Sequence, residues 1–286
     1  MNTPERHPDN PVLARGESGS ADCNGIQFYG SVIRENGLFR MWYIALNEEL
    51  SEMTERKDVF RPAYAESTDG INWTRPSLGL VEYQGNRQNN LLQISPGPMG
   101  FINLKVLVEP DEPDPQKRYK MSAQTWWHSD SGFGRGTLVT LFSADGLSWN
   151  LIQKFKPIKG AIPIEAMCLP PHHFEAAGGL YKWQGKYYAT GQGCSDHNLH
   201  RPTPYSGREV LMHRSKDFIN WEPTAHVGFI REGQYMKFGC GSGEETHEGV
   251  GVWNRNNVLL GFHGVWHGDK NKQWAKTTID IGFSIS

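Results

Sequence analysis

The chain has 286 residues, of which 37% are hydrophobic, so it is long enough to bury a substantial core. Its formal net charge is −2, and the sequence has no long run of residues with the same charge. Both features argue against nucleic acid or an anionic membrane as the partner. Aromatic residues make up 12%, with 32 glycines and 17 prolines, a mixture that favours short strands and tight turns in an all-β protein.

Two features bear on where the protein works. No apolar run approaches the roughly 18 residues of a membrane-spanning helix, and the N-terminal segment lacks the basic-then-apolar layout of a secretory signal. We therefore expect a cytoplasmic protein, or a secreted one if a leader is missing. The four cysteines are scattered without a C-x-x-C pair, which indicates free thiols.

The chain after an expected N-terminal tail, residues 1–20, repeats one pattern. Each unit has two expected strands, then a third strand that runs into a Ser-x-Asp-x-x-x-Trp turn, and a fourth strand that follows each of the first three tryptophans. In chain order the two strands and the turn lie at 28–33, 37–43 and 67–73; at 103–108, 118–123 and 143–149; and at 179–183, 185–191 and 215–221. Units of roughly 70 residues, each a four-stranded antiparallel sheet, predict the blades of a β-propeller.

A fourth unit begins with strands at 249–253 and 257–262, and its turn is reached only at Ser284. We expect blades at about 21–83, 100–157 and 175–228, and an incomplete fourth blade at about 245–286. A blade without its outer strand would leave an unpaired edge near residues 278–286, which predicts completion of the propeller by a second chain.

The repeated turn is expected to be scaffolding. Asp and Gly suit a tight turn, the Ser hydroxyl and Asp carboxylate can accept turn N–H groups, and the tryptophan can pack between neighbouring blades. Phe218 replaces the glycine in the third copy, which predicts a turn without positive φ there.

Histidines and tryptophans gather in the loops expected on the opposite face from these turns. They include Trp126, Trp127, His128, His172, His173, His247, Trp266 and His267. Indole rings beside polar donors suit stacking against sugar rings, and grouped imidazoles suit proton transfer, ligand hydrogen bonding or a metal. Packing between blades is the alternative role for the tryptophans.

The segments GLFRMWY and AYAESTDGINWTRPSLGLVEYQGNRQNN resemble the first blade of the five-bladed propeller glycoside hydrolases, the broad group that contains families 32 and 43. The resemblance covers residues 21–286. It implies a five-bladed all-β propeller and a carbohydrate substrate. It also implies three carboxylates where the innermost strands of successive blades begin.

The residues of this sequence match the three family positions unequally well. A family-32-like enzyme has a nucleophilic Asp, then an Asp in RDPKV that holds sugar hydroxyls, then a Glu acid. The segment INLKV places neutral Asn103 at the second position. Glu175 matches the third position, with Glu165 as its rival. Asp22 is displaced from the first position, where Gln27 stands nearer the expected place.

The segment GEETHEGVGVW brings several acids to the start of the fourth unit, namely Glu244, Glu245 and Glu248, with His247 among them. Crowding near a desolvated axis would raise at least one carboxyl pKa toward a range useful for acid or base catalysis. A divalent cation near Glu245 and His247 is an alternative, although no metal-ligand spacing supports it and we expect no cofactor. A solvated acidic loop is the structural alternative.

Three hypotheses for function follow. The first is a glycoside hydrolase with Glu175 as acid and Glu245 or Asp22 as the second carboxylate. The second is a non-catalytic or degenerate sugar-binding propeller, in which Asn103 marks lost chemistry. The third is a metal-assisted lyase or hydrolase that uses the rim histidines. The first also predicts that Glu175 faces the propeller axis on the same side as His247.

Overall fold

Strands form almost all of the regular structure in a computed structural model of the chain. The structure describes residues 5–48, 59–129, 132–153, 155, 162–163, 169, 174–194, 208–224, 244–267, 276 and 278–286. Apart from the short 3₁₀ helix η2 (Pro115–Lys117), the described elements are strands. None of the described helices is both long and apolar enough to cross a bilayer. The all-β prediction is confirmed.

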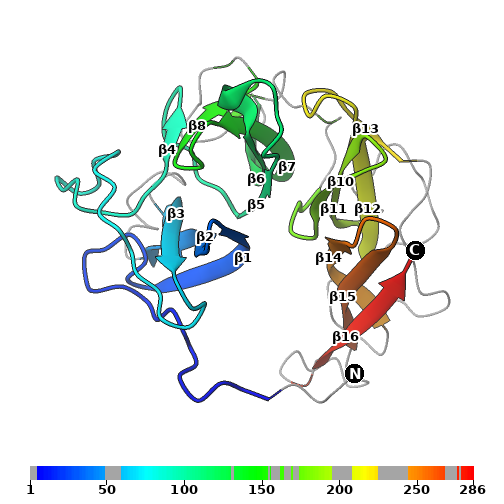
Figure 1. Ribbon diagram of the computed structural model, residues 1–286, viewed down its shortest axis with the longest axis horizontal. Helices are drawn as coiled ribbons and strands as arrows, with labels where there is room; N and C mark the ends of the chain where they lie inside the picture. Colours follow the sequence, from blue (N-terminus) through cyan, green and yellow to red (C-terminus); the bar gives the residue numbers. More distant parts are fainter. Residues whose placement is uncertain are drawn as a thin grey trace.

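Four sheets stand around a common axis (Figure 1). The first sheet contains β1 (Gly25–Glu35), β2 (Leu38–Leu46) and β3 (Phe60–Ser67). The second contains β5 (Asn103–Val108), β6 (Tyr119–Ser129), β7 (Gly132–Ser143) and β8 (Ser148–Leu151), joined by β4 (Gln93–Ser95) and β9 (Ile162–Pro163). The third contains β10 (Leu180–Trp183), β11 (Lys186–Cys194), β12 (Arg208–Ser215) and β13 (Trp221–Pro223). The fourth contains β14 (Glu244–Asn254), β15 (Leu259–His267) and β16 (Thr278–Ile285).

Within each sheet the consecutive strands are antiparallel, as a propeller blade requires. The third sheet has the four strands of the predicted pattern, and the second extends it by the parallel additions β4 and β9. The first and fourth sheets have three strands among the described residues. In the first, an isolated bridge between Glu66 and Thr74 stands where a fourth strand would begin.

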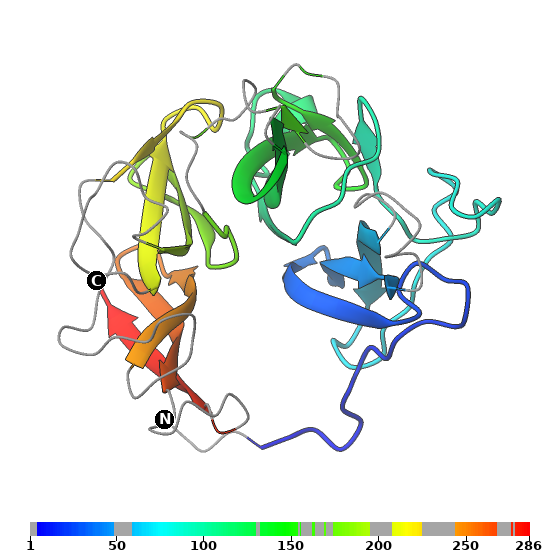
Figure 2. The same ribbon diagram turned by 180° about the vertical axis from the view of Figure 1, so that it is seen from behind.

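The innermost strand of each sheet packs against the innermost strand of the next, in the order β1, β5, β10 and β14. The ribbon shows an opening between the first and fourth sheets, and the view from behind shows the same opening (Figure 2). Among the described strands β16 pairs with β15 alone. Ile281 of β16 is 80% exposed, and across the opening Phe28 of β1 is 52% exposed.

The repeated turn has the predicted hydrogen bonds. In the first copy, Ser67 Oγ accepts the Gly70 N–H at 2.9 Å, and Asp69 Oδ1 accepts the Ile71 and Asn72 N–H groups at 2.8 and 2.7 Å. The same bonds recur at 143–149 and 215–221. In each copy the tryptophan indole donates to the carbonyl three residues earlier. The predicted hydrogen bonds of the turn are confirmed, and Trp149 and Trp221 are buried, whereas Trp73 is only partly buried.

The prediction for the third turn is wrong, because Phe218 has a φ of 66°. The turn keeps the same backbone conformation without its glycine. The Phe218 ring is fully buried and makes T-shaped contacts with Tyr187 and Trp221 at centroid distances of 5.2 and 5.4 Å. Burial of a phenyl ring contributes about 2–3 kcal/mol, which offsets the roughly 1–2 kcal/mol of strain in left-handed backbone.

A carboxylate, a cation and a tyrosine join the first sheet to the second. Arg40 of β2 donates to Glu35 Oε2 at 3.2 Å and to the Tyr119 hydroxyl of β6 at 2.5 Å. Burial acts to raise the pKa of Glu35, but the Tyr119 hydrogen bond and the neighbouring cations Arg118 and Arg40 bring it below its usual value. The side chains of this charge cluster join the outer parts of the two sheets. Their length sets the distance between the sheets there.

The second and third sheets repeat that contact with different residues. Lys120 of β6 pairs with Glu109 at 2.6 Å, and Glu109 accepts a hydrogen bond from the Tyr187 hydroxyl of β11 at 2.6 Å. Lys182 of the third sheet completes the cluster, as Arg118 does in the first interface. The repeat in sequence is therefore also a repeat in the contacts between sheets.

We predict that replacing Trp149 by Ala lowers the free energy of unfolding by about 3–5 kcal/mol, the range for a large aromatic removed from a packed core. Trp149 is 1% exposed in the core shared by the first two sheets, whereas Trp73 is only partly buried. The matched Trp73→Ala variant should therefore lose less free energy of unfolding. Guanidinium unfolding measures both, and a larger loss at Trp73 would contradict the burial argument.

We also predict that Phe218→Gly destabilises the protein, by about 2 kcal/mol, because lost burial exceeds the strain relieved. Asn256→Gly is a control, since Asn256 also has a positive φ, of 69°, but is exposed. That variant should unfold at the same denaturant concentration as the parent or slightly above it. A stabilised Phe218→Gly variant would show that strain dominates at the third turn.

Candidate functional site at the propeller axis

Polar residues lie on or beside the inner strands of three sheets. β5 contributes Asn103 and Lys105, and β14 contributes His247 and Glu248. Glu175 precedes β10 and forms an isolated bridge with Gln192 of β11. Inner strands converge toward a propeller axis, so residues from different sheets can meet there (Figure 1).

A glutamine amide links two glutamates from different sheets. Gln192 is 2% exposed, and its Nε2 donates to Glu175 Oε2 at 2.8 Å. Its Oε1 accepts the backbone N–H of Glu248 at 3.0 Å. The amide therefore fixes the Glu175 carboxylate and the Glu248 backbone at the same time.

Glu248 is held in an unusual backbone conformation. It has a φ of 60° at the point where the register between β14 and β15 shifts, and Gly249 follows it with a φ of 84°. A non-glycine residue in the left-handed region costs about 1–2 kcal/mol, and such strain is common at functional sites. This β-bulge re-aims the Glu248 side chain relative to a regular strand.

His247 lies beside this carboxylate. Its Nε2 is 3.7 Å from Glu248 Oε1, and both side chains are 23% exposed. The imidazole also contacts the buried ring of Trp266 in a T-shaped arrangement, with centroids 5.0 Å apart. Trp266 thus supports His247 by packing, with 6% of its own surface exposed.

Lys105 of the second sheet contacts the first sheet. Its Nζ donates to the carbonyl of Gly30 in β1 at 3.0 Å. Burial lowers the pKa of Lys105 to about 8, while the charge of Glu248 acts in the opposite direction. The Lys105 side chain thus joins the inner strands β5 and β1.

Asn103 and Gln124 form a buried amide pair above Lys105 on the same face of the second sheet. Each is 1% exposed, and Asn103 Nδ2 donates to Gln124 Oε1. Asn103 Oδ1 and Gln124 Nε2 have no hydrogen-bond partner within the protein. Buried amide atoms normally bind a partner, so this pair can bind a hydroxyl group or water.

The structure places Asp22 in a different environment. Its carboxylate accepts hydrogen bonds from Arg75 Nε at 2.7 Å and from the Tyr43 hydroxyl at 2.9 Å, and the residue is 1% exposed. This network borders a polar cavity of about 520 Å³ between the N-terminal segment and the loop that contains Asn90. An ion-paired, buried carboxylate here has a structural partner already, so we do not carry Asp22 into a catalytic role.

The other predicted rim residues lie in several settings. Trp126 is 2% exposed and packs against Phe60, and Trp127 packs on the same core, so both serve packing between sheets. His267 pairs with Asp280 at 3.0 Å. His172 and His173 lie outside the described residues, as do the side chains of His128 and Glu245. Within the described part of the chain, no three His, Cys, Asp or Glu residues are placed to hold a metal ion.

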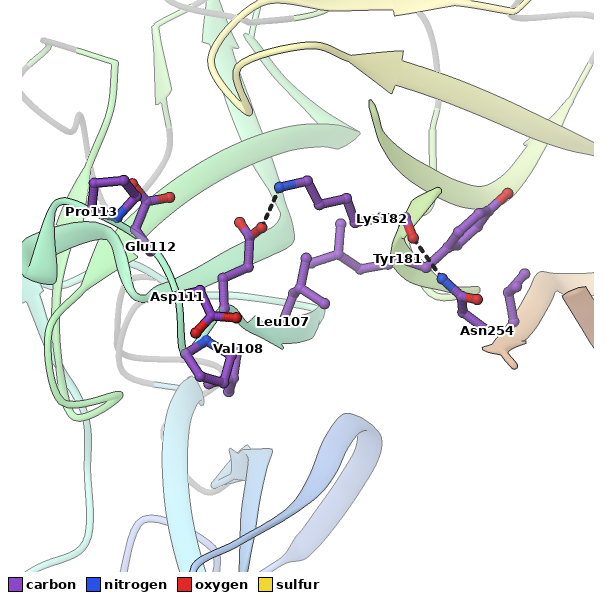
Figure 3. Close-up of a pocket in the computed structure, with 12 residues that line it drawn as sticks. Leu107, Val108, Asp111, Glu112, Pro113, Tyr181, Lys182 and Asn254 are labelled. Carbon is purple, nitrogen blue, oxygen red and sulfur yellow. Dashed lines mark hydrogen bonds and ion pairs between the residues drawn. The ribbon is translucent and has the colours of Figure 1, made fainter. Parts of the chain in front are cut away.

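A second cavity, of about 560 Å³, lies at the opposite ends of the inner strands. It is lined by the end of β5 with the following loop, by β10 and by the end of β14 (Figure 3). There Lys182 pairs with Glu109 at 2.5 Å, and Asn254 donates to the Lys182 carbonyl at 2.7 Å. Lys182 and Glu109 thus join the second and third sheets at this cavity.

Glu248 and Gln192 are the site residues that sequence reasoning did not select. Glu248 was one of several acids in the segment GEETHEGVGVW, and the structure places it in the β-bulge between His247 and Val250. Gln192 lies in a strand that reads as ordinary scaffold. The signal available in the sequence was a long amide side chain directly after a glycine, Gly191.

Comparisons with known proteins identify the fold. No protein-family model and no curated protein sequence matches the chain. Among solved structures, it is similar to one described as a glycoside hydrolase, with a TM-score of 0.55, 14% identity, and 94% of this chain and 72% of that chain covered. It is also similar to a glycosyl hydrolase from Bacteroides ovatus, with a TM-score of 0.51, 16% identity, and 96% and 74% covered.

A third similar structure is an N-acetylgalactosamine deacetylase from F. plautii in complex with blood group B trisaccharide. Its TM-score is 0.53, its identity 11%, and 90% of this chain and 71% of that chain are covered. At such identities the likeness concerns the fold. The chain therefore has the β-propeller fold found in glycoside hydrolases, as the sequence resemblance implied.

We predict that Lys105 gives the protein a distinct alkaline stability profile. The folded state favours the neutral amine, with a pKa of about 8 against 10.5 for an ordinary lysine. Between these values the unfolded chain binds more protons, so the free energy of unfolding rises with pH from this group. Unfolding at a series of pH values should show this rise in the parent and not in Lys105→Met. Equal slopes would contradict the burial argument.

Proposed function

We propose that the chain is a carbohydrate-active enzyme, a glycoside hydrolase whose paired carboxylates lie at the propeller axis. The observation that carries the proposal is the link between Glu175 and Glu248 through Gln192. Two carboxylates across a site are what glycosidic hydrolysis needs, one to protonate the leaving oxygen and one to act on the anomeric carbon or on water.

The surroundings divide these two roles. Glu175 receives its hydrogen bond from a neutral amide, whereas Glu248 lies beside the imidazole of His247, with 3.7 Å between Oε1 and Nε2. A protonated imidazole beside a carboxyl group favours the ionised form of that group. Glu175 is therefore the acid that gives its proton to the glycosidic oxygen, and Glu248 is the carboxylate. Glu245 is the alternative in the same segment.

The amide pair supplies a place for sugar hydroxyls. Asn103 Oδ1 accepts and Gln124 Nε2 donates, and both are free of protein partners. A hydroxyl group can satisfy both atoms because it is at once donor and acceptor. Asn103 is thus the substrate-binding residue of this proposal, as the resemblance implied.

A non-catalytic sugar-binding propeller is the second candidate. It is favoured by the neutral Asn103 at a position where the resemblance to family-32-like enzymes implies a carboxylate. The same buried amide atoms would then bind a glycan hydroxyl without cleavage following. Metal-assisted chemistry by the rim histidines is a third possibility, and its residues lie mainly outside the described part of the chain.

The test is a screen of the purified protein against aryl glycosides and plant or algal oligosaccharides. Glu175→Gln and Glu248→Gln should each lower the rate, by about 10²–10⁴-fold for a lost acid or base. Each replacement keeps the side-chain volume, and Glu222→Gln on the exposed strand β13 is a matched control that should leave the rate unchanged. Binding of an oligosaccharide with no turnover would support the second candidate instead.

A further inference from the structure

The polar cavity beside Asp22 is a feature that the proposed function does not use. It has a volume of about 520 Å³, and residues of the segments 15–22 and 83–90 form most of its lining. Tyr43 of β2, whose hydroxyl donates to Asp22, belongs to a different core cluster from its neighbour Trp42, which packs against the second sheet. Successive residues of a strand point to opposite faces. The cavity is therefore on the face of the first sheet that points away from the second sheet.

The inner wall of this cavity is held by hydrogen bonds within the protein. Asp22 is 1% exposed, and its carboxylate accepts from Arg75 Nε at 2.7 Å and from the Tyr43 hydroxyl at 2.9 Å. Asn90 is 7% exposed, and its Nδ2 donates to the Tyr43 hydroxyl at 2.8 Å and to the Tyr64 carbonyl at 2.7 Å. These bonds fix the orientation of the wall before any ligand arrives.

One polar atom of this buried wall is left over. The amide hydrogens of Asn90 are used on Tyr43 and Tyr64, whereas none of the described residues donates a hydrogen bond to Asn90 Oδ1. Asn90 lines the cavity, so this oxygen is an acceptor for a molecule inside it. Buried amide atoms normally bind a partner, and a hydroxyl group supplies the donor that is missing here.

The outer wall adds polar side chains that can both donate and accept. Part of it is a tight hairpin in which Tyr83 and Asn86 form a bridge, with Gln84 and Gly85 at φ values of 49° and 76° between them. The Gln88 N–H donates to Asn86 Oδ1 at 2.7 Å, which fixes the chain after the hairpin. The uncharged lining side chains that form no hydrogen bond with the described residues include those of Ser18, Ser77, Gln84 and Gln88.

The charges of the lining residues cancel. Arg75 pairs with Asp22 at 2.7 Å, and the exposed Arg15 and Glu17 bring one charge of each sign. A site for an ion would be lined by an excess of the opposite charge, so this balance favours a neutral ligand. The volume lies within the roughly 300–1,000 Å³ of small-molecule sites. Amides and hydroxyls both donate and accept hydrogen bonds, as the hydroxyl groups of a sugar do.

We propose that this cavity is a second carbohydrate-binding site, which holds a neutral saccharide unit by its hydroxyl groups and does not cleave it. The site goes beyond the proposed function, because Asn103, Glu175 and Glu248 are not among the residues that line it. Its buried carboxylate, Asp22, is already ion-paired with Arg75. The cavity therefore binds sugar without acid–base chemistry.

The experiment follows the side-chain amide signals of Gln84 and Gln88 by NMR in the full chain labelled at nitrogen. Each signal is assigned as the one absent from Gln84→Glu or Gln88→Glu. The probes are the neutral trisaccharides cellotriose, xylotriose and mannotriose, with trigalacturonic acid as the anionic comparison. At least one neutral probe should shift both signals and saturate at millimolar concentration, and trigalacturonic acid should bind more weakly. No saturable shift with any neutral probe, or tighter binding of the acid, overturns the proposal.

Variants place the bound probe in the cavity. Ser77→Tyr puts a large ring into the space and should abolish the shift of the Gln88 signal. Gln88→Ala, followed through the Gln84 signal, should weaken binding about 2–10-fold, the effect of one lost hydrogen bond. Both positions are exposed, and Gln116→Ala at an exposed glutamine of η2 is the matched control that should leave the affinity unchanged. Unchanged affinity in Ser77→Tyr or in Gln88→Ala overturns the proposal.

The axis site is followed separately through the side-chain amide of Asn103, assigned by its absence from Asn103→Asp. Shifts at Asn103 with none at Gln84 and Gln88 would place the sugar at the axis and overturn the proposal. Ser77→Tyr and Gln88→Ala should hydrolyse any aryl glycoside found in the screen at the parent rate. The titration needs no turnover, so a failure to find a hydrolysed glycoside contradicts the proposed function and not the binding site.

Discussion

The close approach of the third and fourth sheets is the constraint on which the central site depends. Gly249 of β14 lies so near Gly191 of β11 that a Cβ on Gly249 would stand 2.7 Å from the Gly191 Cα. Across the same contact the Thr190 hydroxyl donates to the Val250 carbonyl at 2.5 Å. Two backbone segments can come this close only where both residues are glycines, because a side chain would collide with the other strand. At that separation a single amide, Gln192, spans both sheets.

The other two interfaces are built differently, and the difference shapes the site. They hold neighbouring sheets apart by charged and aromatic side chains, with Arg40 and Tyr119 in one and Lys120 and Tyr187 in the other. The inner strands of the first two sheets nevertheless contact each other directly, because the Lys105 ammonium donates to the Gly30 carbonyl and Ser31 Oγ accepts the Val106 N–H at 2.9 Å.

Local sequence determines the parts of this structure that could be predicted. The turn motif carries its own hydrogen-bond acceptors, so Ser67 and Asp69 indicate the turn without knowledge of the fold. Phe218 could not be predicted this way, because the compensation for its positive φ comes from Tyr187 of another strand. Trp126 is a similar case, since its burial depends on Phe60, far away in the sequence. Tertiary packing overrides local preference at both residues.

The choice of carboxylate depends on register, which sequence patterns define poorly. A β-bulge between His247 and Val250 shifts the register of β14 within the acidic segment, and a shift of one residue in a strand reverses the direction of every side chain. The bulge requires a residue with left-handed backbone conformation followed by Gly249. Neither the acidic residues nor their spacing in the sequence indicates this bulge. The position of the second carboxylate therefore follows from the backbone contact with Gly191.

The balance of charge at the axis is the last consequence of these contacts. Where the resemblance implies a carboxylate, Asn103 is neutral, and two residues later Lys105 adds a positive charge. An amide in place of a carboxylate removes one negative charge, so the acids that remain repel each other less. Under the proposed function the two carboxylates have different surroundings, because Glu175 binds the neutral amide of Gln192 whereas Glu248 lies beside the His247 imidazole. Different surroundings for two carboxyl groups are the arrangement that acid–base chemistry uses.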